Sequence, residues 1–209
     1  MPPRRKKQER SENSVEQALS TALKLFSSQG FGATSMRQIA EESGLSMGNL
    51  YHHFPNKKAI FQQLLDRYSA RLLAPEHPLQ QIFSRGDFPD DLEALAEVIE
   101  KVVAANAPES VLIYIDVVEF QGECIHGFYQ GLAARLRESY GPKLAARQAA
   151  GQFADDVDPM VGVIVAIRWF FYFFTVEKCF GAAMHMGLTR QQATGELIRL
   201  LRRGLLPRV

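Results

Sequence analysis

The segment from Ser46 to Phe54 carries the side chains of this chain best suited to hydrogen bonding and stacking at an anionic surface. Its sequence is SMGNLYHHF, which holds a tyrosine, an asparagine and two histidines and no acid. If the segment is helical, Leu50 and Phe54 lie four residues apart on one face, with Leu45 packing beside them, and the polar side chains face outward. A polar face without acids suits a polyanion.

A second short helix is predicted directly before this segment. Ser35, followed three residues later by Gln38, has the form of a capping box. Gly44 stands where a helix that ends in the left-handed conformation needs glycine, and Ser46 can cap the helix that follows. Two short helices joined by a tight glycine turn form a helix-turn-helix, whose second helix lies in the major groove of DNA. The unit 35–54 therefore predicts DNA binding.

Gly48 lies inside the predicted second helix, where glycine costs about 1 kcal/mol relative to alanine. Close approach of the helix backbone to DNA is one reason for a glycine at this position. A small packing contact, or simple tolerance, is the other, and the sequence does not separate the two.

Several stretches between residues 14 and 61 match a known pattern. They are ALKLF (22–26), GF (30–31), TSMRQIA (34–40), GLS (44–46) and LYHHFPNK (50–57). Through them this block, about a quarter of the chain, resembles the N-terminal domain of the TetR family of bacterial transcriptional regulators. The resemblance implies an all-α fold, in which a three-helix DNA-binding domain precedes a variable helical domain that binds small molecules and dimerises.

The resemblance also implies roles for individual residues. Arg37 and the outward residues of the second helix would approach bases, whereas Tyr51, His53 and Lys57 would approach phosphates. Asn56 would cap the next helix. Met47 departs from the family, whose members often carry lysine, arginine or glutamine there, so the base read by this position stays open. The expected DNA-binding residues are Ser35, Arg37, Ser46, Met47, Gly48, Asn49, Tyr51, His52, His53 and Lys57.

Charge is unevenly distributed along the 209 residues, whose net charge is +1. Residues 1–60 hold nine lysines and arginines against five acids, whereas the remainder holds fifteen against eighteen. The excess lies in the run Arg4–Lys7 and at Arg10. We expect a flexible basic arm over residues 1–10, which either follows DNA phosphates or the minor groove or is a solvated tail.

The rest of the chain reads as helix throughout. The predicted domains are the helix-turn-helix domain over 11–56 and an effector-binding and dimerisation domain over 57–209, joined by a linking helix over 57–73. Apolar spacing, capping residues, glycines and prolines place the expected helices at about 14–29, 57–73, 90–105, 109–123, 125–153, 158–180 and 189–204, with a possible interruption at 140–142.

The segment 160–180 is apolar nearly all round. A membrane span needs about 20 apolar residues, and Arg168 interrupts a run of only about 17, so we expect no membrane span. A helix apolar on every side must be buried on every side. We therefore predict that one side packs on its own core and the other, together with Ala193, Leu197, Leu200 and Leu201, on the second subunit of a homodimer.

Aromatic residues in the second half could surround a cavity for a largely apolar or aromatic effector. Plain core packing is the alternative for any one of them. Arg168 either pairs with Glu119 or Asp116 or grips a ligand carboxylate, and the sequence leaves both open. The candidate effector-binding residues are Tyr114, Glu119, Phe120, His126, Phe128, Arg168, Trp169, Tyr172 and Phe173.

Enzymatic function finds no support in the sequence. It holds no nucleophile motif, no phosphate-binding glycine loop and no ligand spacing for a catalytic metal, so no cofactor or metal is expected. Glu119, Glu123 and His126 fall within two helical turns, but a metal site there would need a second Glu-x-x-His pair, and the sequence holds none. Cys124 and Cys179 fit no metal or redox pattern and no signal peptide follows the basic run, which favours the cytoplasm. We therefore expect a homodimeric, ligand-responsive repressor that binds a palindromic operator. A ligand-independent or architectural DNA-binding protein is the alternative, ahead of a carrier or enzyme.

Overall fold

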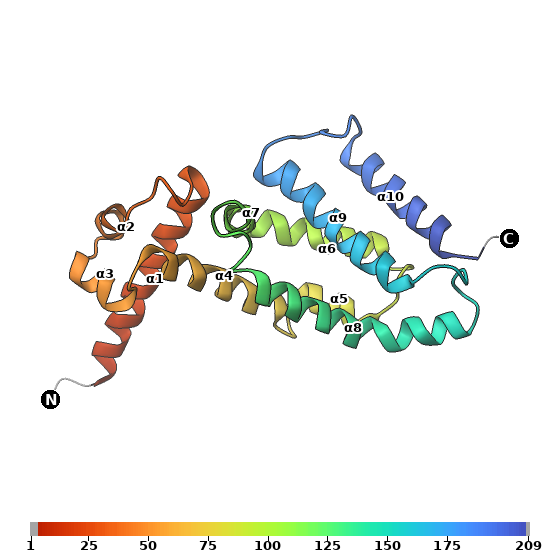
Figure 1. Cartoon of the computed structure of the whole chain (residues 1–209), viewed down its shortest axis with the longest axis horizontal. Coiled ribbons are helices and arrows are strands. Elements are labelled where there is room, and N and C mark those ends of the chain that lie inside the picture. The colour runs from red at the N-terminus through yellow and green to blue at the C-terminus, as the bar shows by residue number, and fades with distance from the viewer. Residues whose placement is uncertain (1–3, 208–209) are drawn as a thin grey trace. The chain divides into compact units, whose positions relative to one another are not determined.

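The computed structural model describes residues 4–207 and is all-helical within them, which confirms the predicted all-α class (Figure 1). The helices are α1 (Arg4–Gln29), α2 (Met36–Ser43), α3 (Met47–His53), α4 (Lys57–Leu73), α5 (Pro78–Arg85), α6 (Leu92–Ala105), α7 (Ala107–Phe120), α8 (His126–Ala149), α9 (Pro159–Cys179) and α10 (Arg190–Leu205).

The first helix begins earlier in the chain than the sequence analysis predicted. We expected a flexible arm over 1–10 and a first helix from about Ser14, but α1 begins at Arg4. The arginines, lysines, glutamine and glutamates of this stretch are good helix formers, so the helix continues toward the N-terminus. Residues 1–3 lie outside the described part.

Helix α5 was not predicted, because the prolines around it were taken only as a break. His77 caps it, accepting a hydrogen bond from the Leu79 N–H at Nδ1 (3.2 Å), and Pro78 occupies the first turn. Gly86 ends it in the left-handed conformation (φ 64°). Proline is favoured in the first turn because an N–H there would have no partner within the helix, and glycine is favoured at the end because it adopts the left-handed conformation without strain. Helix α8, by contrast, continues through Pro142 without the possible interruption.

The chain divides into two compact units. Unit 1 comprises residues 1–69 and 111–126, and unit 2 comprises residues 70–110 and 127–209. The division falls inside α4 and inside α7, so the C-terminal part of α7 belongs with the helix-turn-helix and not with the domain predicted for 57–209.

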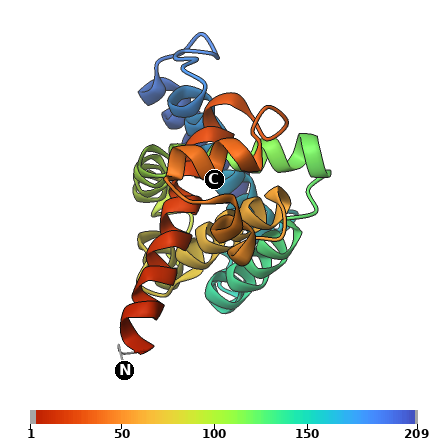
Figure 2. The same ribbon diagram turned by 90° about the vertical axis from the view of Figure 1, so that its left-hand side faces the viewer.

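In unit 1, helices α1, α2 and α3 pack against one another (Figure 2). Ala18, Ala22 and Ala40 are buried at this packing, and their small side chains let the helices approach closely. Four phenylalanines from four segments meet beside them. The ring centroids of Phe31 and Phe120 are 4.8 Å apart, and those of Phe26 and Phe61 are 5.6 Å apart.

In unit 2, α9 packs along α6, and α10 packs along α9 (Figure 1). Phe170, Phe173 and Phe174 of α9 are buried in this core. At Gly162 a Cβ atom would lie 2.9 Å from the methyl groups of Leu205, so a glycine allows the close contact between α9 and α10. Among the described residues α9 is apolar and long enough to pass for a membrane span, but half of its most apolar window is buried in the protein, as in a core helix.

Candidate nucleic-acid interface

The turn between α2 and α3 is set by three residues acting locally. Ser35 accepts a hydrogen bond from the Gln38 N–H (3.1 Å), and Ser46 accepts one from the Asn49 N–H (3.1 Å). Between them Gly44 adopts φ 71° and directs its N–H toward the end of α2. Side chains that cap helix starts and a glycine in the left-handed region fix the turn without help from distant segments. The predicted helix-turn-helix is thus present.

Helix α3 separates a buried face from an exposed one. Leu50 and Phe54 are 0% and 2% exposed and hold the helix against its neighbours. On the other face the side chains of Met47 and Tyr51 are 38% and 51% exposed. A Cβ atom at Gly48 would meet nothing within 4 Å, so no packing contact inside the chain requires this glycine. The exposed face is therefore free for a partner.

Two of the predicted base-contacting residues are engaged in other contacts. The side-chain amide of Asn49 donates a hydrogen bond to the Ser14 hydroxyl (3.2 Å), which ties α3 to α1. Arg37 donates to Glu41 one turn along α2 (2.7 Å), and this hydrogen bond raises the pKa of Arg37. The Arg37–Glu41 pair is exposed, and exposed pairs are weak enough to exchange for a phosphate or a base.

The three remaining predicted residues lie at the end of α3 and the start of α4. His52 is exposed and its ring contacts that of His53 at 5.0 Å. Asn56 caps α4, accepting a hydrogen bond from the Ala59 N–H (2.9 Å), as expected. Lys57 follows it in the first turn, but its side chain turns toward the protein.

Lys57 fastens α4 to the loop before α2. Its ammonium donates to the carbonyl oxygens of Phe31 and Thr34, both at 2.6 Å, and lies 4.1 Å from the centre of the Phe31 ring. Burial lowers the pKa of this ammonium. Because two of its three donors are used inside the protein, Lys57 holds the helix-turn-helix in place whether or not it also reaches a phosphate.

The turn after α7 is attached to α4, a contact for which the sequence holds no local signal. Glu123 pairs with Lys58 (2.8 Å). The buried carboxylate of Asp116 accepts hydrogen bonds from the N–H groups of Cys124 and Ile125 (both 3.1 Å). Burial, and then the hydrogen bond with Asp116, raises the pKa of the Cys124 thiol to about 12, which disfavours a reactive thiolate.

The candidate effector residues fall in both units. Tyr114, Glu119, Phe120 and His126 lie in the part of the chain grouped with the helix-turn-helix, and Phe128, Arg168, Trp169, Tyr172 and Phe173 lie in unit 2. Phe120 contributes to the aromatic cluster of unit 1. In unit 2, the rings of Trp169 and Phe173 stack at 4.8 Å.

Arg168 is exposed on α9. Its guanidinium group lies 5.7 Å from the ring centre of Tyr129. Asp116, one of the two acids considered as its partner, uses both carboxylate oxygens for backbone N–H groups. Helix α9 presents Arg168 at its surface and buries aromatic side chains on its other faces.

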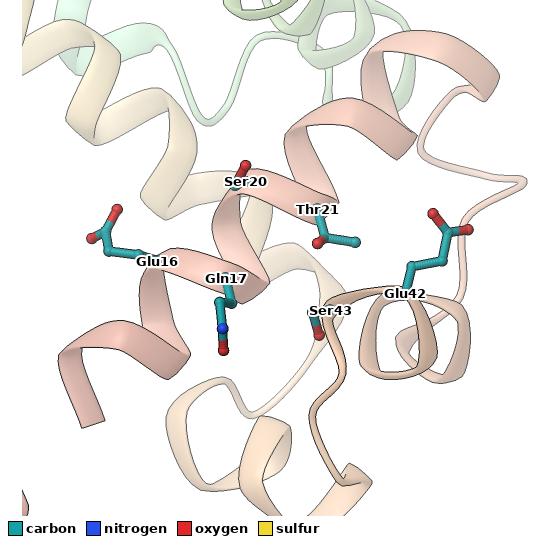
Figure 3. A pocket seen from close by; sticks show the side chains of 6 residues that line it. All are labelled: Glu16, Gln17, Ser20, Thr21, Glu42 and Ser43. Carbon is teal, nitrogen blue, oxygen red and sulfur yellow. The ribbon is translucent and has the colours of Figure 1, made fainter. Parts of the chain in front are cut away.

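A shallow pocket opens between α1 and α2 (Figure 3). Its volume is about 410 Å³, and it is lined by Glu16, Gln17, Ser20, Thr21, Glu42 and Ser43. Two glutamates and no cation line this pocket, so it is unsuited to phosphate.

Comparison with known proteins agrees with this geometry. Residues 18–64 match the model of the bacterial regulatory proteins of the tetR family. The chain is 38% identical over 155 residues to the uncharacterized HTH-type transcriptional regulator YxaF of Bacillus subtilis (strain 168), covering 73% of this chain and 79% of the relative. It is 29% identical over 161 residues to the HTH-type transcriptional repressor KstR2 of Rhodococcus jostii (strain RHA1), covering 73% of this chain and 77% of the relative.

Solved structures share the fold. NalD, the secondary repressor of the MexAB-OprM multidrug efflux pump in Pseudomonas aeruginosa, superimposes with a TM-score of 0.66 at 19% identity, covering 96% of this chain and 100% of that chain. The MbdR regulator from Azoarcus sp. CIB gives a TM-score of 0.65 at 19% identity, covering 93% and 100%.

The capped helix-turn-helix and its exposed second helix define a DNA-binding regulator of transcription. The chain belongs to the TetR family of bacterial transcriptional regulators.

Proposed function

We propose that this regulator is a homodimeric repressor that binds a palindromic operator through α3 and leaves it when a small, largely apolar effector binds. The main support for this proposal is the exposed face of α3. The opposite face of the helix packs on the protein through the buried side chains of Leu50 and Phe54. A reading helix must be rigid to be specific, and capping serines at both short helices supply that rigidity.

DNA recognition is assigned to the exposed side chains of this face and of α2. Met47 and Tyr51 offer apolar and hydrogen-bonding contacts to base edges, and Gly48 lets the backbone approach the groove closely. Arg37 reaches a base or a phosphate after exchanging its pair with Glu41. His52, His53 and Lys57 are the proposed phosphate contacts, with Lys57 acting mainly by holding the unit together.

Dimerisation is assigned to apolar stripes on α9 and α10 in unit 2. Val161, Val165 and Tyr172 of α9 are 54%, 43% and 55% exposed, and they recur on one face of the helix. Leu200 of α10 is 67% exposed. Adjacent apolar residues left open to water mark a protein interface, and a dimer would place two α3 helices on half-sites about 34–36 Å apart.

Effector binding is assigned to unit 2, where Trp169 and Phe173 stack and Arg168 provides a cation at the surface. The relative KstR2 is a repressor by name, which supports repression here. The effector can change DNA affinity only through its difference in affinity for two arrangements of the protein, so DNA must weaken effector binding by the same factor. Such a regulator acts in the cytoplasm, where it meets DNA.

Selection of duplexes from a random DNA pool by the purified protein tests this function. We expect enrichment of an inverted repeat with half-site centres about 10 base pairs apart. Aromatic and long-chain apolar compounds are then added to the complex. A compound of the effector's chemical class should lower the affinity for the operator about 5- to 150-fold. If an operator is enriched but no compound releases the protein from it, the ligand-independent alternative is favoured. If no sequence is enriched, specific recognition is refuted.

A further inference from the structure

The segment between α5 and α6 holds three aspartates, of which Asp91 lies at the start of α6. An aspartate at this position usually accepts a hydrogen bond from an N–H of the first helical turn. Asp158 does so at the start of α9, accepting from the Met160 N–H at 2.8 Å. The side chain of Asp91 makes no such hydrogen bond. Its carboxylate is therefore not stabilised by the helix that it precedes.

Both carboxylate oxygens of Asp91 are shielded from solvent and, among the described residues, have no hydrogen-bond partner. The same holds for the hydroxyl of Tyr140 on α8, whose side chain is 0% exposed. The Tyr140 ring packs against Phe83 and Phe88, with centroid distances of 5.9 and 6.4 Å. A buried carboxylate without a partner is costly while it is charged, and it becomes much less costly once it is neutral.

The charged groups around Asp91 do not compensate its charge. Arg147 of α8 binds Asp90 at 3.0 Å and the carbonyl oxygen of Phe88 at 2.9 Å. Arg202 of α10 makes two bonds of 2.7 Å to Glu93 and also donates to the carbonyl oxygens of Pro89 and Asp90. The cations of α8 and α10 are thus occupied by other acceptors.

Burial, followed by the charge of Asp87, raises the pKa of Asp91 to about 6, and Asp90 adds to this while Arg85 of α5 opposes it. Burial, and then the charges of Asp91 and Asp87, likewise raises the pKa of Tyr140.

We propose that the Asp91 carboxyl group is a proton-binding site, at which the corner of α5, α6, α8 and α10 takes up one proton in mildly acidic solution and is stabilised by it. A proton from solvent bonds to one carboxylate oxygen and removes the buried charge. Tyr140 stays neutral throughout. The unit that carries α9 and α10 thereby gains a response to pH that depends on neither DNA nor effector.

The direction of the pH dependence follows from the raised pKa. Below the pKa of an unfolded aspartate, about 3.9, the group is protonated in both states and has no effect on the free energy of unfolding. As pH rises from there through about 6, the folded protein holds the proton longer than the unfolded chain, so stability falls. Above about 7 the loss is complete.

Thermal unfolding of the full chain from pH 3.5 to 8 tests the proposal, with fluorescence of Trp169 reporting on unit 2, since it is the single tryptophan. Asp91→Asn replaces the carboxylate with a neutral group of the same shape. At pH 8 we expect this variant to unfold about 2–6 °C above the wild type, with roughly half of the difference left at pH 5 and closure only below about pH 4. Asp156→Asn is the control, because Asp156 is an exposed aspartate of the same unit whose charge does not act on Asp91, and its difference from the wild type should be constant from pH 5 to 8.

A carboxyl carbon titration of the wild-type protein by NMR gives a second measurement that needs no variant. We expect one aspartate signal, missing in Asp91→Asn, to titrate near pH 6. A temperature difference independent of pH, or titration of the Asp91 carboxyl group near pH 4, would overturn the proposal.

Discussion

The two units of this regulator differ in how completely their buried polar groups are satisfied. Both units cap helices with adjacent side chains, Ser35 and Ser46 in unit 1 and Asp158 and Thr189 in unit 2. Both also hold ion pairs between residues far apart in sequence, such as Lys58 with Glu123 in unit 1 and Arg202 with Glu93 in unit 2. The buried side-chain atoms that lack a partner among the described residues all lie in unit 2.

This difference matches the roles that we propose for the two units. A DNA-reading helix must hold one arrangement, so its buried polar groups are satisfied. The ligand response proposed for unit 2 needs arrangements of similar free energy, and unsatisfied buried groups reduce the gap between them. The comparison therefore predicts that equal substitutions have different consequences in the two units.

The largest expected effect concerns the exposed apolar residues. Replacing Val161 and Val165 together by glutamate should convert the dimer to a monomer, because charges would be buried at the interface. Operator affinity should fall at least about 100-fold, since two linked reading helices bind far more tightly than one. Sedimentation and a gel shift measure the two results.

Val118 provides the matched control, because it is more exposed still, at 81%, but lies in unit 1. Val118→Glu should leave the oligomeric state unchanged. A wild-type protein that sediments as a monomer at micromolar concentration, or a dimer that survives Val161→Glu with Val165→Glu, would contradict the assignment of the interface.

The next largest effect concerns two adjacent lysines of α4. Lys57→Met removes two partly buried, charge-assisted hydrogen bonds to carbonyl oxygens, and we expect a loss of about 1–3 kcal/mol in the free energy of unfolding of unit 1. Lys58→Met removes only an exposed pair with Glu123 and should cost clearly less than Lys57→Met. Urea unfolding measures both.

Salt dependence of DNA binding then separates the two roles of Lys57. A phosphate contact would lower the slope of log affinity against log salt by about one in Lys57→Met. Equal stability of the two lysine variants would show that the internal hydrogen bonds of Lys57 contribute nothing.

The smallest effect compares helix starts. Ser46→Ala removes a capping hydrogen bond from α3 and should destabilise unit 1 by about 1 kcal/mol. Asp91→Ala at the start of α6 removes no cap and, at pH 7.5, should leave unit 2 as stable as before or more stable. Hydrogen exchange of the backbone amides in α3 and α6 measures the change in local stability that each substitution causes. Similar losses in both helices would refute the contrast between the units.

The same contrast explains what the sequence could predict. Ser35, Gly44 and Ser46 act on neighbours within a few residues, so the helix-turn-helix and its exposed face follow from local patterns. Thr189 and Gln192 form the predicted capping box of α10 for the same reason. Membership of the family was also visible in the stretches from 22 to 57.

Contacts between distant segments gave no such signal. Phe120 was expected near an effector, but it contacts Phe31 and Phe61 of unit 1 across long stretches of chain. Lys57 was expected to face outward, because a pattern does not show which carbonyl oxygens fold back toward it. The missing cap at Asp91 is likewise a matter of geometry, since its residue type predicts the opposite.

We propose above all that the exposed face of α3 reads the operator sequence. The most direct test is the ratio of affinities for the selected operator and a scrambled duplex, measured at one salt concentration for the wild type, Tyr51→Ala, Tyr51→Phe and Tyr129→Ala. Tyr129, in unit 2, is a comparably exposed tyrosine, 42% against 51%. We predict that Tyr51→Ala lowers operator affinity by about 1–3 kcal/mol with little change in affinity for the scrambled duplex. Tyr51→Phe shows how much of this loss comes from the hydroxyl group. Tyr129→Ala should change the affinity for neither duplex. An unchanged ratio in Tyr51→Ala, or an equal loss on both duplexes, would contradict the assignment of α3 as the reading helix.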